Sequence, residues 1–204
     1  DSGYYDDYGS SHWRNYYTRT VAHNSITVFD SSEQFFRRLG SGENCCSNDG
    51  GQKFPDPANP TLEQIMPGGI SALDGIVGYT NTTSYSYTKG NASKAYSAEK
   101  LDQTNGFIRE IIFLRDEPFW DKPIIVIFDK VTAKRSKAEL NKRFLLHMVN
   151  EPTPLQGWTE GPGIHDIDDP LVVIRNGEGL VYSQTVLPVD AAIRKIGGRD
   201  EERD

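Results

Sequence analysis

The sequence predicts an all-β protein, folded as an antiparallel β-sandwich. Helical periodicity is scarce along the 204 residues, whereas short stretches rich in Val, Ile, Thr, Tyr and Phe recur between clusters of Gly, Pro, Asn and Asp. Apolar runs separated by turn residues are typical of an all-β domain. The expected strands lie near residues 24–29, 75–80, 84–88, 107–114, 123–131, 140–149, 171–175 and 179–186.

The patterning within these runs predicts which strands are buried. Charged residues interrupt the apolar positions of 107–114, as in a strand with one buried face. The run 123–128 is apolar on both faces, which predicts a central, largely buried strand. The Gly-rich segment 176–179 separates two apolar runs and predicts a hairpin. Residues 40–70 are punctuated by Gly and Pro, which predicts a long loop of the kind that often carries function.

The composition disfavours several functional classes. The formal charge of −7 argues against general nucleic-acid binding, which relies on clustered Lys and Arg. The longest aliphatic run, residues 124–128, is far shorter than the ~18 apolar residues of a membrane span. No zinc-finger spacing, P-loop or GxGxxG motif occurs, and no targeting segment is visible. The two cysteines, Cys45 and Cys46, are adjacent, so a disulfide between them is expected to be strained.

The first 23 residues hold an unusual density of aromatic side chains. They contain five tyrosines, one tryptophan and two of the four histidines. Aromatic faces stack on sugar rings and hydroxyls hydrogen-bond to them, so one interpretation is a binding surface. The other is a core-packed edge of the sandwich, because counting does not distinguish exposed from buried tyrosines.

Several segments of the chain resemble heparinase II/III-type polysaccharide lyases. DSGYYDDYGSSHWRNYYTRTVAHNSITVFD at 1–30, followed by NDGGQK at 48–53, is similar to the zinc-bearing region of that family. REIIFLRDEPFWDKPIIVIFDKV resembles its paired strands, LLHMV at 145–149 the following strand, and GEGLVYSQTVLP a late hairpin. The segments occur in the family's order and span nearly the whole chain.

The resemblance implies that residues 1–204 form the C-terminal β-sandwich domain, of supersandwich type, of a longer lyase. In such lyases an N-terminal helical toroid packs on the sandwich, with the substrate cleft between them. The toroid, which supplies the main catalytic tyrosine, has no counterpart here. The family's first sandwich strand, which carries a His-x-His element, also has none. The chain alone is therefore expected to be inactive, and no catalytic residue is assigned within it.

The resemblance also implies a zinc site. It places metal ligands on Asp1 and His23, while the third ligand of the family belongs to the His-x-His element. Zinc needs three or four ligands from a rigid frame, so two leave the site incomplete unless His12 substitutes. Without the resemblance, His23 is simply a hydrogen-bonded histidine at the start of a strand.

Uronate lyases cleave by β-elimination, in which the C5 proton is removed, the carboxylate is neutralised and the leaving oxygen is protonated. Tyr and His suit the proton steps, and an Arg pairs with a carboxylate or sulfate. The residues expected to line the substrate cleft are Tyr8, His12, Tyr16 and Arg19. The alternative role of these four is to order the loop around the metal.

Other polar features have plainer interpretations. His147 lies between large apolar residues and is expected to be a partly buried strand residue. His165 lies in an acidic segment that predicts a solvated loop. The basic residues between 130 and 143 predict an exposed turn, with attraction of a polyanion as the alternative.

Two functions follow from these observations. The first is part of a secreted or periplasmic bacterial lyase that cleaves a uronate-containing polysaccharide, such as a glycosaminoglycan or alginate, together with the toroid of the same parent chain. The second is a non-catalytic carbohydrate-binding or structural β-sandwich whose aromatic cluster is the binding face. The net charge of −7 fits a polyanionic substrate only if local Arg and Lys residues, or the toroid, supply the attraction.

Overall fold

The chain folds as two compact units, Asp1–Leu145 and Leu146–Asp204. All strand pairs in the described residues are antiparallel, which confirms the expected all-β antiparallel sandwich class. No helix among these residues has the length and apolar character needed to cross a membrane. The computed structural model describes residues 7–35, 46–54, 57, 59–115, 122–134, 139–155 and 163–197.

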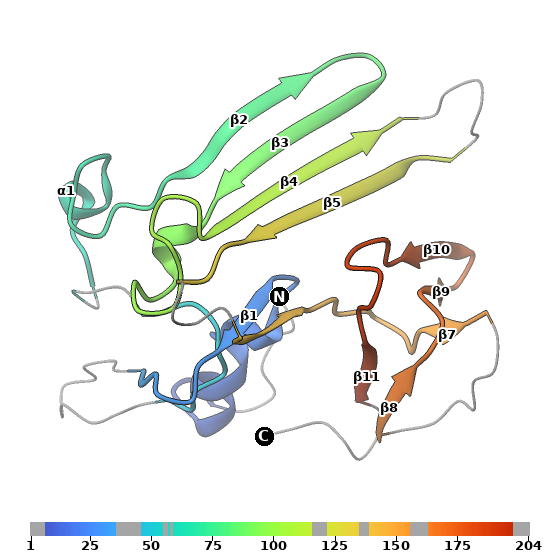
Figure 1. Cartoon of the computed structure of the whole chain (residues 1–204), viewed down its shortest axis with the longest axis horizontal. Helices are drawn as coiled ribbons and strands as arrows, with labels where there is room; N and C mark the ends of the chain where they lie inside the picture. The colour runs from blue at the N-terminus through green and yellow to red at the C-terminus, as the bar shows by residue number, and fades with distance from the viewer. Residues whose placement is uncertain are drawn as a thin grey trace. The chain divides into compact units, whose positions relative to one another are not determined.

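A four-stranded sheet is the larger layer of the first unit (Figure 1). Its strands are neighbours in chain order and each pairs antiparallel with the next. Thr82 closes the first hairpin, because its hydroxyl accepts hydrogen bonds from the backbone N–H groups of Ser84 and Tyr85. The strands are β2 (Gly75–Asn81), β3 (Tyr85–Asn91), β4 (Phe107–Leu114) and β5 (Ile124–Val131).

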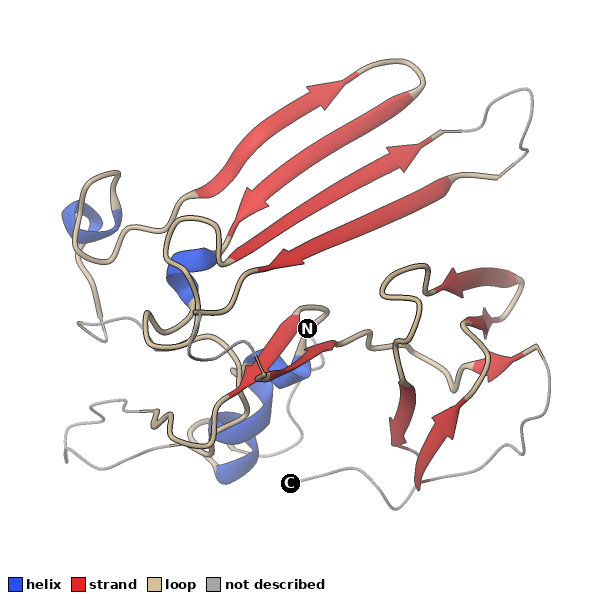
Figure 2. Ribbon diagram, viewed as in Figure 1, coloured by secondary structure: helices blue, strands red, loops and turns tan. Residues whose placement is uncertain are grey.

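The second layer of this unit is a two-stranded sheet (Figure 2). Strand β1 (Ile26–Phe29) pairs with β6 (Asn141–Phe144). The short helices η1 (Trp13–Tyr17) and η2 (Thr20–Ala22) lie beside this sheet. Two other short helices, α1 (Leu62–Ile65) and η3 (Ser93–Ala95), precede β2 and β4 of the four-stranded sheet. A capping box between Thr61 and Gln64 starts α1 inside the segment expected to be a loop.

The core of the first unit lies where the two layers meet. Ile26 and Val28 of β1 pack with Tyr96, Leu101 and Phe107, and all five are almost fully buried. The Tyr96 ring meets the Phe107 ring edge-on at a centroid distance of 5.8 Å, a favourable aromatic geometry. Its hydroxyl donates to the Ile26 carbonyl at 2.7 Å, so the buried polar atom has a partner.

Tyr96 makes the first unit sensitive to alkaline pH. Burial raises the pKa of Tyr96 from its usual 10.0 to about 12. Between pH 10 and pH 12 the folded state therefore keeps the hydroxyl proton, whereas the unfolded state loses it. The free energy of unfolding falls by an amount on the order of 2–3 kcal/mol as the pH rises from 10 through 12. In Tyr96→Phe the free energy of unfolding should fall less steeply across this range. Chemical denaturation at several pH values measures it, with the exposed Tyr79→Phe as a control that keeps the wild-type slope.

The expected burial of the 123–128 run is wrong. Ile125 is 62% exposed and Phe128 is 52% exposed, and the residues between them are also exposed. Strand β5 forms the edge of its sheet, and the core of this unit reaches the sheet only at the end marked by Phe107 and Val131. An apolar pattern on both faces makes burial of a strand favourable. Whether the strand is buried depends on its position in the sheet and on how much of the sheet the second layer covers.

The second unit contains two small sheets. One has the order β10-β9-β7, and the other pairs β11 with β8. The hairpin expected at 176–179 is present, with Gly177 at the turn in a left-handed conformation (φ 57°). The strands are β7 (Thr153–Pro154), β8 (Gly163–Ile167), β9 (Leu171–Asn176), β10 (Gly179–Gln184) and β11 (Ile193–Gly197).

Two histidine interpretations are corrected in this unit. His147 is exposed and lies beyond the end of β6 at Phe144, so it is not a partly buried strand residue. His165 lies on β8 opposite Lys195 of β11 instead of in a loop. The acidic residues around His165 conceal the strand in the sequence, because charged side chains such as Asp166 point outward and pair with Arg194 on the neighbouring strand.

Candidate functional site

The NDGGQ segment, Asn48–Gln52, forms a turn beside strand β1. The Gly50 carbonyl accepts a hydrogen bond from the Val28 backbone N–H at 2.8 Å. The Asn48 side-chain amide donates to the backbone carbonyls of Asp30 and Glu33, and its oxygen accepts from the Gly50 N–H. Asn48 therefore joins the turn to the segment that leaves β1, although the two are far apart in sequence.

The two glycines of the turn are required by close packing. Gly50 has φ 75°, and a Cβ on it would lie 2.9 Å from the Phe29 backbone. A Cβ on Gly51 would lie 2.4 Å from the Thr20 Cβ. No side chain fits at either distance without a shift of the chain. The Thr20 hydroxyl also accepts from the Gln52 N–H at 2.8 Å, so helix η2 and the turn hold each other in place.

Arg19 connects η2 to the same turn through a buried ion pair. The guanidinium donates to Asp49 Oδ1 at 2.6 Å and to the Gln52 carbonyl at 3.0 Å. Its central carbon lies 4.1 Å and 4.7 Å from the ring centroids of Phe35 and Phe54, within cation–π range. Arg19 is only 2% exposed, so the Asp49 carboxylate is needed to offset its desolvation.

A second buried cation contacts the turn from a segment 50 residues further along the chain than Gly50. Lys100 is fully buried, and its ammonium donates to Glu33 and to the carbonyls of Gly50 and Gly51. Burial lowers the pKa of Lys100 and raises the pKa of Glu33, because water no longer solvates either charged form. Each buried charge is therefore stabilised by the other, and the carbonyls of the turn further stabilise the Lys100 ammonium.

This pairing predicts an asymmetric response to mutation. Lys100→Met leaves the Glu33 carboxylate buried without its cation and should lower the free energy of unfolding by about 3–5 kcal/mol. The double variant Lys100→Met with Glu33→Gln removes both charges and should lose less than the single variant. Denaturant unfolding measures both.

Lys94→Met is the matched control for this experiment. It removes a half-exposed ion pair with Asp74, which should cost at most about 1 kcal/mol. An equal loss in the single and double variants would contradict a dependence of Glu33 on Lys100.

A pocket of about 360 Å³ opens between η2 and the turn. Arg19 and His23, both identified from the sequence, contribute to its wall. Lys53, which is exposed, adds a positive charge to the described lining. Thr18, Thr20 and Ser25 contribute hydroxyl groups. The lining residues are Thr18, Arg19, Thr20, His23, Ser25, Gln52, Lys53 and Phe54. Cations and hydrogen-bond donors without an acidic side chain suit an anionic ligand.

His23 has a geometry that fits a metal ligand. Its Nε2 lies 3.2 Å from the Tyr17 carbonyl oxygen. A carbonyl only accepts, so His23 donates this hydrogen bond from Nε2. Histidines that bind metals commonly donate their other N–H to a carbonyl in this way. Asp1 lies outside the described residues, and within them no group of three or more His, Cys, Asp or Glu side chains could hold a metal ion.

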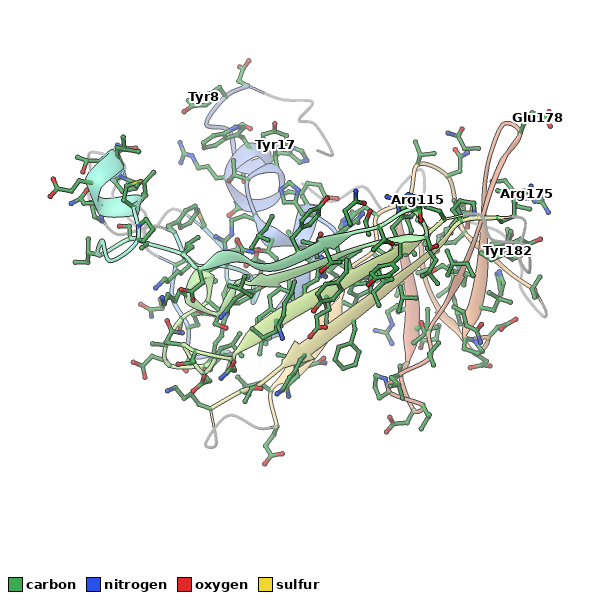
Figure 3. The ribbon with its side chains drawn as sticks, turned by 90° about the horizontal axis from the view of Figure 1, so that it is seen from above. Tyr8, Tyr17, Arg115, Arg175, Glu178 and Tyr182 are labelled. Atoms are coloured by element: carbon green, nitrogen blue, oxygen red, sulfur yellow. The ribbon has the colours of Figure 1, made fainter. Side chains whose placement is uncertain are left out.

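The other three predicted cleft residues are not among those that line the pocket. Tyr8 is 77% exposed (Figure 3). Its ring packs on Trp13 at a centroid distance of 4.5 Å. His12 is buried next to the half-buried Tyr16, with ring centroids 5.3 Å apart. Burial raises the pKa of Tyr16, which keeps its hydroxyl protonated. The aromatic cluster thus contains both the exposed and the packed side chains that the sequence left as alternatives.

Sequence reasoning missed the residues that hold the pocket wall in place. Asp49 had a signal, because it belongs to the NDGGQ motif. Lys100 and Glu33 had none, since a lysine or glutamate in a polar segment is usually solvated.

Cys46, two residues before Asn48, is disulfide-bonded, and the only other cysteine, Cys45, lies outside the described residues.

No family model and no curated protein matches this chain.

Proposed function

We propose that this chain is the β-sandwich portion of a polysaccharide lyase that cleaves uronate-containing acidic polysaccharide, a glycosaminoglycan or alginate, by β-elimination. One observation carries the proposal. The described parts of the two segments that resemble the zinc-bearing region of the lyases, 7–30 and 48–53, meet around one pocket through the Arg19–Asp49 ion pair and the Thr20–Gln52 hydrogen bond. A cationic pocket that both segments line supports the proposal of an acidic substrate.

The pocket's contribution to such a reaction is electrostatic. Abstraction of the C5 proton places negative charge on the adjacent carboxylate, and positive groups near that carboxylate stabilise the transition state. Lys53, which is exposed, supplies that charge here. The described lining contains no tyrosine, so the proton transfers belong to residues outside the pocket, including those of the toroid domain.

Zinc belongs to this proposal as a cofactor held by His23 and Asp1 with a third ligand from the parent chain. In a longer chain that restores the preceding strand, His23→Ala should lower both the zinc content and the melting temperature, because a metal that binds only the folded state stabilises it. Elemental analysis and thermal unfolding measure these two effects. His147→Ala is the control and should leave the zinc content unchanged. Retention of zinc in the His23 variant with loss in the His147 variant would move the site to His147.

The proposal predicts binding without cleavage. The purified chain should bind immobilised heparin or alginate more tightly than neutral dextran, while producing none of the ultraviolet-absorbing unsaturated uronate. Lys53→Glu should weaken polyanion binding about three- to tenfold, the scale of one lost exposed ionic contact. Lys130→Glu, at the end of β5 and the start of the basic run 130–143, should leave it unchanged.

Three results would change this conclusion. Equal binding of dextran would favour the alternative function, a non-catalytic carbohydrate-binding module. A loss confined to Lys130→Glu would place polyanion attraction on the basic run. Steady formation of unsaturated uronate by the chain would show that it holds its own catalytic residues. The secreted or periplasmic bacterial location stays part of the proposal.

A further inference from the structure

Strand β5 is an unprotected edge of the four-stranded sheet (Figure 1). Natural proteins protect edge strands with prolines, charged side chains or bulges, because unpaired backbone groups otherwise pair with another chain. The other edge of this sheet, β2, has a bulge between Ile76 and Gly78. Strand β5 pairs with β4 in unbroken register, and residues 124–128 contain no charge and no proline. This edge is therefore open to a further strand.

One hydrogen bond identifies the residues of β5 whose backbone groups face the open edge. The Thr132 N–H, just after β5, donates to the carbonyl of Gly106, just before β4, at 2.8 Å. Thr132 therefore directs its N–H toward β4. Successive residues of an antiparallel strand direct their backbone groups to opposite sides. The residues whose N–H and C=O groups face the open edge are thus Ile125, Ile127, Asp129 and Val131.

A hydrogen bond at the other end of β4 gives the same assignment. The Arg115 N–H, just after β4, donates to the Ser84 carbonyl at 2.9 Å, on the side of β3. The backbone groups of the preceding residue, Leu114, therefore face β5. Ile124 is the partner of Leu114 in the register and turns toward β4, so Ile125 turns toward the open edge.

A strand that pairs with this edge has to match apolar side chains on both faces of the sheet. Ile125 and Ile127 point to one face and Val126 and Phe128 to the other, and each is at least 44% exposed. Within the part of the chain that the structure describes, no other strand has five consecutive apolar residues. The best match to β5 is therefore β5 of a second copy.

The apolar surface available for this pairing is large enough for a weak dimer. The exposed surface of residues 124–128 is on the order of 500 Å² in each copy, so two copies approach the ~1,000 Å² of the smallest specific interfaces. The segment carries no charge, so the pairing brings no ionic side chain of the five residues into a dry contact.

An antiparallel pairing about a two-fold axis at Ile127 fits the side chains. Edge-facing residues then lie opposite edge-facing residues, with Ile127 opposite Ile127 of the second copy. Val126 lies opposite Phe128, a favourable pair of a β-branched and an aromatic side chain. Lys130 lies opposite Ile124. No two like charges are directly opposed, and all five apolar residues have a partner within the strand.

Neighbouring registers fit less well. An axis at Val126 places Lys130 directly opposite Lys122, and opposed like charges are destabilising. An axis at Phe128 leaves Ile124 without a partner within the strand. Larger shifts pair fewer residues of β5.

We infer that the open edge of β5 pairs antiparallel with β5 of a second copy of this chain, about a two-fold axis at Ile127. Such a contact uses the same surface on both copies, so it closes as a dimer. The bulge of β2 at each outer edge of the continuous eight-stranded sheet opposes further pairing. The inference goes beyond the proposed function and does not depend on it.

Sedimentation equilibrium of the full chain tests this inference. A monomer–dimer equilibrium with a dissociation constant of about 1–100 µM is expected for an interface of this size. Residue-resolved hydrogen exchange should slow about tenfold or more for the Ile125 and Ile127 amides as the dimer forms, because these N–H groups gain acceptors. The Val126 and Phe128 amides already face β4 and are the matched controls, whose exchange should change less.

Charged variants at the axis test the register. Ile127→Lys and Ile127→Glu each oppose two like charges and should raise the dissociation constant about tenfold. An equimolar mixture of the two should form a heterodimer with a dissociation constant within about threefold of wild type, because position 127 meets itself. Ile76→Lys, 71% exposed at the bulged edge, is the matched control and should leave the dimer unchanged. Melting temperatures check that each variant is folded.

Four results would overturn the inference. One is a chain that stays monomeric up to about 300 µM, well above the expected dissociation constant. Slow exchange of the Ile125 and Ile127 amides in the monomer would show that another segment covers the edge. A mixture of the Lys and Glu variants that associates no better than either alone would remove the axis from Ile127. Species larger than a dimer would show that the contact does not close.

Discussion

The described site depends on the burial of two cations beside one turn. Arg19 and Lys100 are both almost inaccessible to water, and an unpaired buried charge costs several kcal/mol. Asp49 and Glu33 provide the opposite charges, and the carbonyls of Gly50, Gly51 and Gln52 accept the remaining hydrogen bonds. The turn therefore has to keep its carbonyls pointed at the cations.

This constraint explains the composition of the turn. Carbonyls that face two cations from a turn packed on Phe29 and Thr20 leave no room for side chains at Gly50 and Gly51. The Asn48 side-chain amide donates to the Asp30 carbonyl just after β1, and the Asp49 carboxylate accepts a hydrogen bond from Arg19. Each position of NDGGQ thus has a physical role, and substitution at one position affects the others through the shared hydrogen bonds.

The same constraint defines the character of the pocket. Arg19 is committed to the turn, which makes its guanidinium a fixed part of the wall instead of a mobile surface charge. Rigid donors lose little entropy when a ligand binds. Lys53, next to the turn, adds the charge that Asp49 does not neutralise. A chain with a net charge of −7 can in this way present a locally cationic site.

The sequence by itself determined the all-β class, the segments of the site and most strands of the first unit. Alternation of apolar and polar residues is local, so β4 at 107–114 was readable directly. Tertiary structure alone decided that β5 is an exposed edge, that β8 and β11 pair, and that Lys100 is buried against Glu33. Each of these outcomes depends on partners many residues away. The side chains of β5 would suit a core, but burial requires a layer to cover them, and a lysine enters a core only where distant segments supply a carboxylate and carbonyls to receive it.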